Sequence, residues 1–208
     1  MGDVSPVDVS AFFIKAFVDK ITALKNIFRR GTVRIMFKID ETVNYSSCGL
    51  CKIADIAKKD FTGKNEDYYV LKPVTQENLT YYVAVNNKSL TDKMYPTLSK
   101  SQIYELIKAM PDEKEIWIDN DYVRQSKYKE ILASGDRLEI VRMIKTLYSR
   151  KKRRVEKGKR LMKCDENFLR EAEANLYNEF ALVLDIKPDE VLPFIVSNIE
   201  VSDIKDPV

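Results

Sequence analysis

Cys48 and Cys51 form a Cys-x-x-Cys pair, a spacing that can supply half of a zinc site or a redox couple. The chain has three cysteines and no histidine, too few thiols and imidazoles for a four-ligand zinc site. Thioredoxin-type pairs begin a helix, whereas this pair lies between two β-prone segments. We therefore expect a structural turn at Cys48 and Cys51, with no metal and no cofactor. A redox-responsive switch at these two residues is the alternative.

The absence of histidine also excludes several kinds of enzyme. It removes His-based acid/base catalysis and the Ser-His and Cys-His nucleophile pairs. The six glycines form neither a G-x-G-x-x-G nor a G-x-x-x-x-G-K-[ST] motif, so no phosphate-cradling loop is predicted. We therefore expect neither an enzyme nor a small-molecule substrate.

Charge is unevenly distributed along the second half of the chain. Residues 124–163 contain 15 Lys and Arg against 4 Asp and Glu, a local charge of +11, whereas residues 165–208 have a local charge of −8. A basic block that keeps an apolar period is a folded basic surface, and its commonest partner is DNA or RNA. The alternative is a solvated helix surface that the acidic segment neutralises. The candidate phosphate contacts are Arg124, Lys127, Lys151, Arg153, Lys159 and Arg160.

Trp117 is the single tryptophan and lies just before the basic block. A lone tryptophan usually belongs to a core. An exposed aromatic ring beside Lys and Arg can instead stack on bases or wedge between them. Trp117 is therefore a candidate DNA contact, with a core position as the alternative.

The predicted secondary structure changes from strands to helices near residue 98. Short β-prone segments separated by turns predict a small Tudor- or SH3-like β-barrel over 36–98. From Ser99 the apolar period becomes 3.6, which predicts a compact all-α domain over 99–200 and a tail over 201–208. The fold class is therefore α+β with two domains. The expected strands are 42–46, 50–57, 68–72 and 79–85. The expected helices are 99–110, 121–133, 136–148, 165–184 and 188–195, with a basic run over 150–154 after the third.

Residues 1–35 have a pattern of their own. Apolar residues at spacings of three and four predict a basic amphipathic helix between Ser10 and Gly31. Met36 begins a new pattern, so we interpret 1–35 as a tag, an upstream mis-start or an appended helix. A membrane-surface or targeting helix is the alternative. No stretch reaches the roughly 20 apolar residues that span a bilayer, and free thiols favour a reducing cytoplasm.

Four stretches from Met36 onward resemble the CarD family of bacterial transcription regulators. MFKIDETVNY at 36–45 is similar to the family's opening, and Gly63 with DYYVL at 67–71 is similar to its hairpin. ASGD at 133–136 is similar to its helical-domain turn, and KRL at 159–161 begins a stretch similar to its ending. Each motif alone is weak, but the ordered set spans residues 36–200. The tryptophan of some members aligns with Asp121, one helical turn after Trp117.

The resemblance implies a cytoplasmic, nucleoid-associated regulator with two partners. The Tudor-like domain would bind the RNA polymerase β subunit, and the helical domain would hold promoter DNA while a tryptophan wedge stabilises the open complex. Trp117 is the residue available for that role. A DNA-binding architectural protein that needs no polymerase is the alternative. The expected polymerase contacts are Lys59, Thr80, Tyr81, Tyr82 and Val83.

Overall fold

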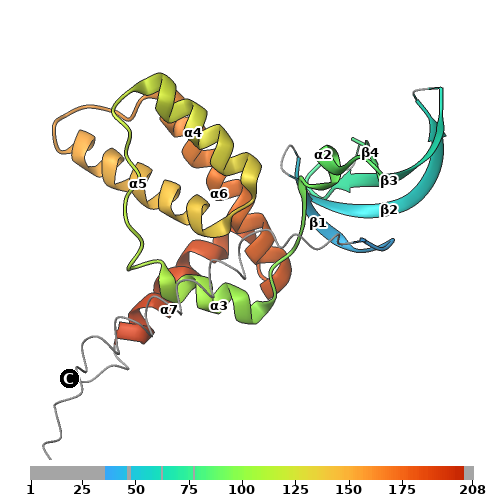
Figure 1. Ribbon diagram of the computed structural model, residues 1–208. Helices are drawn as coiled ribbons and strands as arrows, with labels where there is room; N and C mark the ends of the chain where they lie inside the picture. Colours follow the sequence, from blue (N-terminus) through green and yellow to red (C-terminus); the bar gives the residue numbers. More distant parts are fainter. Residues whose placement is uncertain (1–35, 46–47, 62, 77, 204–208) are drawn as a thin grey trace, which may run out of the picture. The chain divides into compact units, whose positions relative to one another are not determined.

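The computed structural model describes residues 36–203 except 46, 47, 62 and 77, and these described residues belong to one compact unit. Within it, a β-sheet comes first and helices follow (Figure 1). The helix expected between Ser10 and Gly31 lies outside the described residues. The side chains of 200–203 are likewise not described.

One antiparallel sheet contains all five strands, in the order β4-β3-β2-β1-β5. The four expected strands are present, with a fifth near residue 95 and a short helix, α2, that was not expected. The described parts of β4 and β5 form the two edges and do not pair with each other. The sheet is therefore not closed, and the predicted Tudor- or SH3-like barrel is not confirmed. The elements are β1 (Thr42–Tyr45), β2 (Gly49–Asp60), β3 (Asn65–Pro73), β4 (Tyr81–Ala84), α2 (Lys88–Thr91) and β5 (Met94–Pro96).

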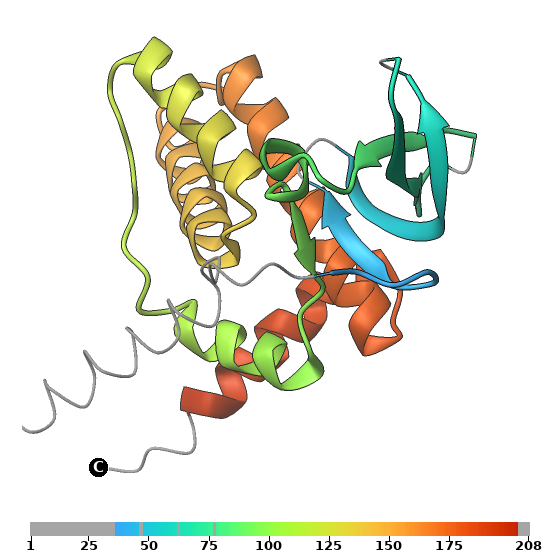
Figure 2. The same ribbon diagram turned by 45° about the vertical axis from the view of Figure 1, so that its right-hand side comes forward.

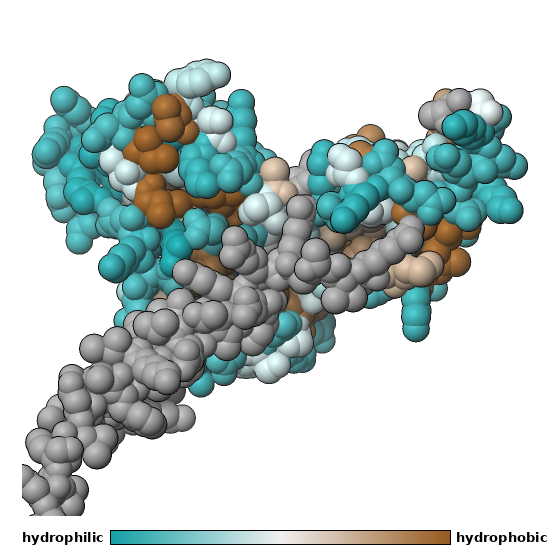
Figure 3. Space-filling model, in the orientation of Figure 1, coloured by the Kyte–Doolittle hydropathy of each residue, from teal (hydrophilic) through white to brown (hydrophobic). Residues whose placement is uncertain are grey.

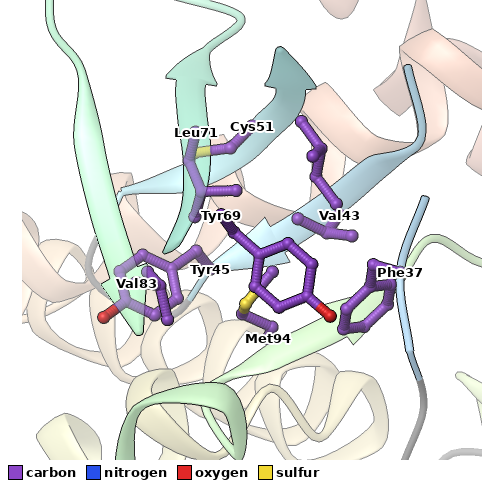
Figure 4. Packing of buried hydrophobic residues seen from close by; sticks show 9 residues of the cluster. Phe37, Val43, Tyr45, Cys51, Tyr69, Leu71, Val83 and Met94 are labelled. Atoms are coloured by element: carbon purple, nitrogen blue, oxygen red, sulfur yellow. The ribbon is translucent and has the colours of Figure 1, made fainter. Parts of the chain in front are cut away.

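β2 bends at a bulge, which lets the sheet curve around its own core. The β2–β3 register shifts between Ile53 and Asp55, and an extra residue in one strand increases bend and twist. Side chains from β1, β2, β3, β4 and β5 meet on the concave side, as Figure 4 shows for Val43, Leu71 and Val83. These residues are at most 1% exposed, so the sheet has a dry core despite its open edges.

Six helical segments follow the sheet. α4, α5 and α6 lie side by side, and both views agree on this arrangement (Figures 1 and 2). The basic run over 150–154, expected after the third helix, is part of α5, so its side chains are spread around a helix. The segments are α3 (Lys100–Ala109), α4 (Asp121–Ser134), α5 (Arg137–Val155), α6 (Lys163–Leu184), η1 (Pro188–Glu190) and α7 (Val191–Asp203).

Local signals set several helix ends where the sequence predicts them. Ser99 and Gln102 form a capping box at α3, and the Asp136 side chain accepts hydrogen bonds from Leu138 N and Glu139 N at α5. Gly135 ends α4 with φ +65°. A Cβ there would collide with the Tyr95 ring, so glycine is needed both for its conformation and for its size.

A buried ion pair joins the sheet to the helices. Arg137 of α5 donates to Glu179 of α6 at 2.8 Å, and the two side chains are 7% and 1% exposed. Arg137 also donates to Pro96 O of β5, and Glu179 accepts from the backbone N–H of Leu98. The pair therefore fixes the chain segment that leaves the sheet directly to two helices.

Candidate functional site

The outer face of the sheet brings together two of the predicted polymerase contacts. Tyr82 of β4 lies opposite Val70, which in turn lies opposite Asp55 on β2, whereas Val83 belongs to the core. Because side chains alternate along a strand, Tyr82 points away from the core. Lys59 lies four residues along β2 from Asp55 and so shares that face. Tyr82 is 42% exposed and is therefore accessible to a partner.

The other three predicted contacts have different surroundings. Thr80 is exposed and precedes β4, while Tyr81 and Val83 point toward the core. Their side chains are thus not on the face of Tyr82. The backbone of β4 is nevertheless an edge, since among the described residues it pairs with β3 alone. An edge strand offers unpaired N–H and C=O groups to a further strand.

Phe61 joins this outer face and was missed in the sequence. Its ring centroid lies 5.1 Å from that of Tyr68 and 5.1 Å from that of Tyr82, and Phe61 is 57% exposed. It directly follows β2 and lies outside the expected strand 50–57, so the strand prediction did not include it. An exposed aromatic group beside Lys59 and an open strand edge is typical of a protein-binding surface.

Trp117 is held in a polar cage between α4 and α5. The Cζ atoms of Arg124 and Arg150 lie 4.2 and 4.3 Å from its ring centroid, within cation–π distance. Its indole N–H donates to Asp119 Oδ1 at 2.8 Å. Trp117 is half-buried, so it belongs neither to the dry core nor to the freely exposed surface.

Arg124 departs from its predicted role as a phosphate contact. Its side chain is fully buried and donates to Asp165, Asp121 and the backbone oxygen of Ile118. Burial would lower its pKa, but the hydrogen bonds to Asp165 and Asp121 outweigh burial and raise it. Arg124 therefore pairs with the buried Asp165 and the half-exposed Asp121 and packs on Trp117, and its guanidinium group is not exposed to contact DNA phosphates.

The remaining predicted phosphate contacts are accessible but do not form a single face. Lys127 pairs with Glu130 at 3.1 Å, and Arg153 donates to Glu115. Hydrogen bonds from Ser149 and Arg153 lower the pKa of Glu115. Lys151 is exposed and lies two positions before Arg153, so the two side chains leave α5 about 160° apart.

Lys159 and Arg160 are exposed in the segment between α5 and α6. This segment is anchored, since Arg154 Nε donates to Arg160 O at 2.6 Å. The cations are thus concentrated on the C-terminal half of α5 and the segment that follows it. In Figure 3, hydrophilic residues dominate the visible surface of the helical region around a small hydrophobic patch.

The cysteine pair has the properties of a structural turn. Cys48 lies in the turn before β2, and Cys51 is fully buried in the sheet core. Burial, with a further contribution from neighbouring Cys48, raises the pKa of Cys51 to about 12. Burial also raises the pKa of Cys48. A thiol that stays protonated is a poor nucleophile and a poor metal ligand, which weighs against the redox alternative.

We expect Cys51 to resist alkylation in the folded protein. Burial raises the pKa of Cys51 to about 12, so its thiol stays almost entirely protonated at pH 8. Mass spectrometry after iodoacetamide treatment should find Cys51 modified at least a hundredfold more slowly in folded than in denatured protein. Cys48→Ser/Cys51→Ser should keep its transcriptional effect in reducing buffer. Rapid native alkylation of Cys51, or a response to oxidant that this variant loses, would contradict the structural role.

The described residues contain neither a metal-binding cluster nor a membrane-spanning helix. No group of three or more His, Cys, Asp or Glu side chains in that part of the chain is placed to hold a metal ion. Likewise, none of the described helices combines the length and apolarity needed to cross a membrane.

Comparison with known families gives two matches. The model described as "CarD-like/TRCF RID domain" matches residues 37–96, and the model described as "CarD, C-terminal domain" matches residues 102–195. No curated protein matches the chain. The first match spans the sheet and the second begins in α3 and ends in α7, so most of the described fold is covered. The chain belongs to the CarD family of transcription regulators.

Proposed function

We propose that this protein binds the RNA polymerase β subunit through its sheet and promoter DNA through its helical region, and that it thereby stabilises the open promoter complex. Membership of the CarD family implies an interaction with RNA polymerase. The surfaces and the consequence for the promoter are inferred from the chemistry described above.

The polymerase surface in this proposal is the open edge β4 and the outer face beside it. A strand of the β subunit would extend the sheet at β4 through backbone hydrogen bonds. Tyr82 and Phe61 would supply aromatic anchors, and Lys59 would meet an acidic residue of the partner. Aromatic anchors surrounded by polar residues carry most of the binding energy in such interfaces.

The DNA surface in this proposal consists of the exposed cations at the end of α5 and after it. Lys151, Lys159 and Arg160 are exposed and could contact phosphates directly. Arg153 and Lys127 would first exchange their carboxylate partners for phosphate. These contacts position the protein without reading sequence, so discrimination between open and closed DNA requires a contact to the bases.

The open complex is stabilised only if the protein binds it more tightly than the closed complex. A protein that touches polymerase and DNA at once can do this when its two surfaces are rigidly connected. Arg137, Glu179 and the hydrogen bond from Tyr95 Oη to Ala133 O at 2.5 Å supply such a connection. One observation carries the proposal. The region matched by the first family model has an open strand edge with exposed aromatic residues, and the region matched by the second has exposed cations at the end of α5.

The test of the proposal uses the full chain with RNA polymerase holoenzyme and a promoter fragment. The protein should co-purify with the holoenzyme, and its addition should lengthen the open-complex lifetime after a heparin challenge. Binding to promoter DNA without any affinity for polymerase would instead favour the architectural alternative.

Salt dependence provides a further prediction for the basic surface. If about five cations neutralise phosphates, the slope of log K against log salt concentration should be about −4 to −5 for duplex DNA. Fluorescence anisotropy between 50 and 300 mM KCl measures it. Lys151→Ala/Lys159→Ala/Arg160→Ala should reduce the slope by about 3, whereas Lys64→Ala, in the turn between β2 and β3, should leave it unchanged. A slope near zero for the unaltered protein would mean that the basic surface does not meet DNA.

A further inference from the structure

The segment 110–120, which we call the strap, connects α3 to α4 and lies against α5. Figures 1 and 2 show it as an extended loop between the two helices that it joins. Lys145 Nζ of α5 donates to Pro111 O at 2.5 Å. Ile116 N donates to Thr146 Oγ1 at 2.9 Å, and Thr146 is fully buried. The strap is therefore fixed to α5 by hydrogen bonds of its backbone.

Half of the cations of α5 face the strap. The helix contains eight Lys and Arg residues. The strap engages four of them, through a backbone oxygen at Lys145, carboxylates at Arg142 and Arg153, and the Trp117 ring at Arg150. At about 100° per residue, these four side chains leave α5 within a sector of about 140°. The strap thus covers one side of the basic helix, and DNA that approaches from this side competes with it.

The contact between Glu115 and Arg153 is the more accessible of two ion pairs that join the strap to α5. The side chains of Glu115 and Arg153 are 35% and 53% exposed. The corresponding fractions for Glu113 and Arg142 are 10% and 21%. An anion from solvent can therefore reach Arg153, whereas Arg142 is shielded together with its carboxylate partner.

Two donors one helical turn apart converge on the Glu115 carboxylate. Ser149 and Arg153 are four residues apart on α5, and the side chains of both donate to it. Arg153 Nε also donates to Ser149 O at 3.3 Å, which holds the guanidinium group along the helix. Guanidinium and hydroxyl groups are also donors that proteins use to bind DNA phosphates. A phosphate and the Glu115 carboxylate would therefore compete for the same two donors.

Exchange of Glu115 for a phosphate requires little rearrangement. An exposed ion pair contributes little to stability. The next residue, Ile116, keeps its hydrogen bond to the buried Thr146, so only the Glu115 side chain has to rotate. A cation that meets DNA also releases condensed counterions, which favours the phosphate over a single carboxylate. Glu115 therefore weakens DNA binding at this place without preventing it.

We propose that Ser149 and Arg153 form a phosphate-binding site that Glu115 fills in the free protein, so that the strap competes with DNA for α5. This inference rests on the proposed binding of promoter DNA and adds its regulation. A protein whose cations are partly held by its own carboxylates binds duplex DNA weakly by itself. Contact with RNA polymerase raises the local concentration of promoter DNA and overcomes the competition. Occupation of the site by DNA then depends on polymerase.

The first test measures the affinity of the full chain for a duplex promoter fragment by fluorescence anisotropy, in low-salt buffer without polymerase. Glu115→Gln should raise the affinity about two- to fivefold, as expected for release of one exposed ion pair. Glu156→Gln is the matched control, because Glu156 is exposed at the end of α5 and has no ion pair among the described residues. It removes the same charge and should raise the affinity clearly less. An affinity that Glu115→Gln leaves unchanged or lowers, or an equal gain in Glu156→Gln, would overturn the inference.

The second test repeats the Glu115→Gln substitution in an Arg153→Ala background. The gain in affinity should largely disappear there, because the competition needs the guanidinium group. A gain that persists in full without Arg153 would show that Glu115 merely repels DNA, and this result also contradicts the proposed site. Circular dichroism should give the same spectrum for all variants, since both side chains are partly exposed.

Failure of the whole DNA surface gives a different result from failure of this site. If neither the unaltered protein nor Glu115→Gln binds duplex DNA, the proposed DNA binding fails, and this inference fails with it. Salt-dependent DNA binding that Glu115→Gln does not strengthen overturns this inference alone and leaves the proposed function intact.

Discussion

The double variant Lys59→Glu/Tyr82→Asp is expected to abolish binding to the RNA polymerase β subunit while the protein remains folded. Both residues lie on the outer face of the sheet, and neither belongs to its core. The change introduces one negative charge on the edge strand β4, where the proposed interface buries an aromatic side chain, and another on β2 on the same face. Loss of an aromatic anchor and reversal of a charge each exceed about 2 kcal/mol at interface hot spots, so affinity should fall more than a hundredfold.

Surface plasmon resonance against the isolated β subunit measures this affinity. Lys58→Glu is the matched control, since Lys58 neighbours Lys59 on β2, is exposed, and points to the opposite face. It should change the affinity less than threefold. Circular dichroism and thermal unfolding should be the same for both variants. Equal affinity of the double variant and the unaltered protein would remove this face from the proposed interface.

The elements predicted well from the sequence are those set by neighbouring residues. Ser99 and Gln102 lie three positions apart, and Gly135 with Asp136 ends one helix and begins the next, so these boundaries depend on local hydrogen bonds alone. The strand over 68–72 is likewise predicted by the β-propensity of its own aromatic and β-branched residues. Closure of the sheet depends instead on whether its first and last strands meet. That is a long-range property, and the predicted barrel is accordingly the part of the fold not confirmed.

In the candidate site, too, features set by local sequence are predicted and features set by long-range contacts are not. Charge composition indicates a basic surface, but it does not distinguish a cation that faces solvent from one paired inside the protein. Arg124 has its buried partner Asp165 41 residues away. Lys59 and Tyr82 lie on the same face of the sheet because of the register of β2, β3 and β4 and the bulge at Ala54. Contacts between residues far apart in the sequence therefore remove Arg124 from the candidate phosphate contacts and add Phe61 to the candidate polymerase surface.

Removal of the buried Glu179 carboxylate should cause a large loss of stability. Glu179→Ala leaves the Arg137 guanidinium buried without its counter-charge and the Leu98 N–H without its acceptor. Removing one partner of a buried ion pair costs about 3–5 kcal/mol. The melting temperature of a protein of this size should fall by roughly 6–20 °C.

Urea unfolding followed by circular dichroism measures this loss. Glu171→Ala is the control, because Glu171 is exposed on the same helix, and it should change the free energy of unfolding by less than about 0.5 kcal/mol. Glu179→Gln keeps an acceptor for Leu98 and should lose less than Glu179→Ala. Equal stability of Glu179→Ala and Glu171→Ala would show that the pair does not stabilise the fold.

The same substitution tests whether the two proposed surfaces act together. Glu179 touches neither the face of Tyr82 nor the end of α5, so at a temperature where Glu179→Ala is folded it should still bind the β subunit. The connection between Pro96, Leu98 and the helices is nevertheless weakened. A looser connection lowers the local concentration of the DNA surface at the promoter. Open-complex lifetime should therefore shorten although polymerase affinity is unchanged, and an unchanged lifetime would mean that the two surfaces need no rigid connection.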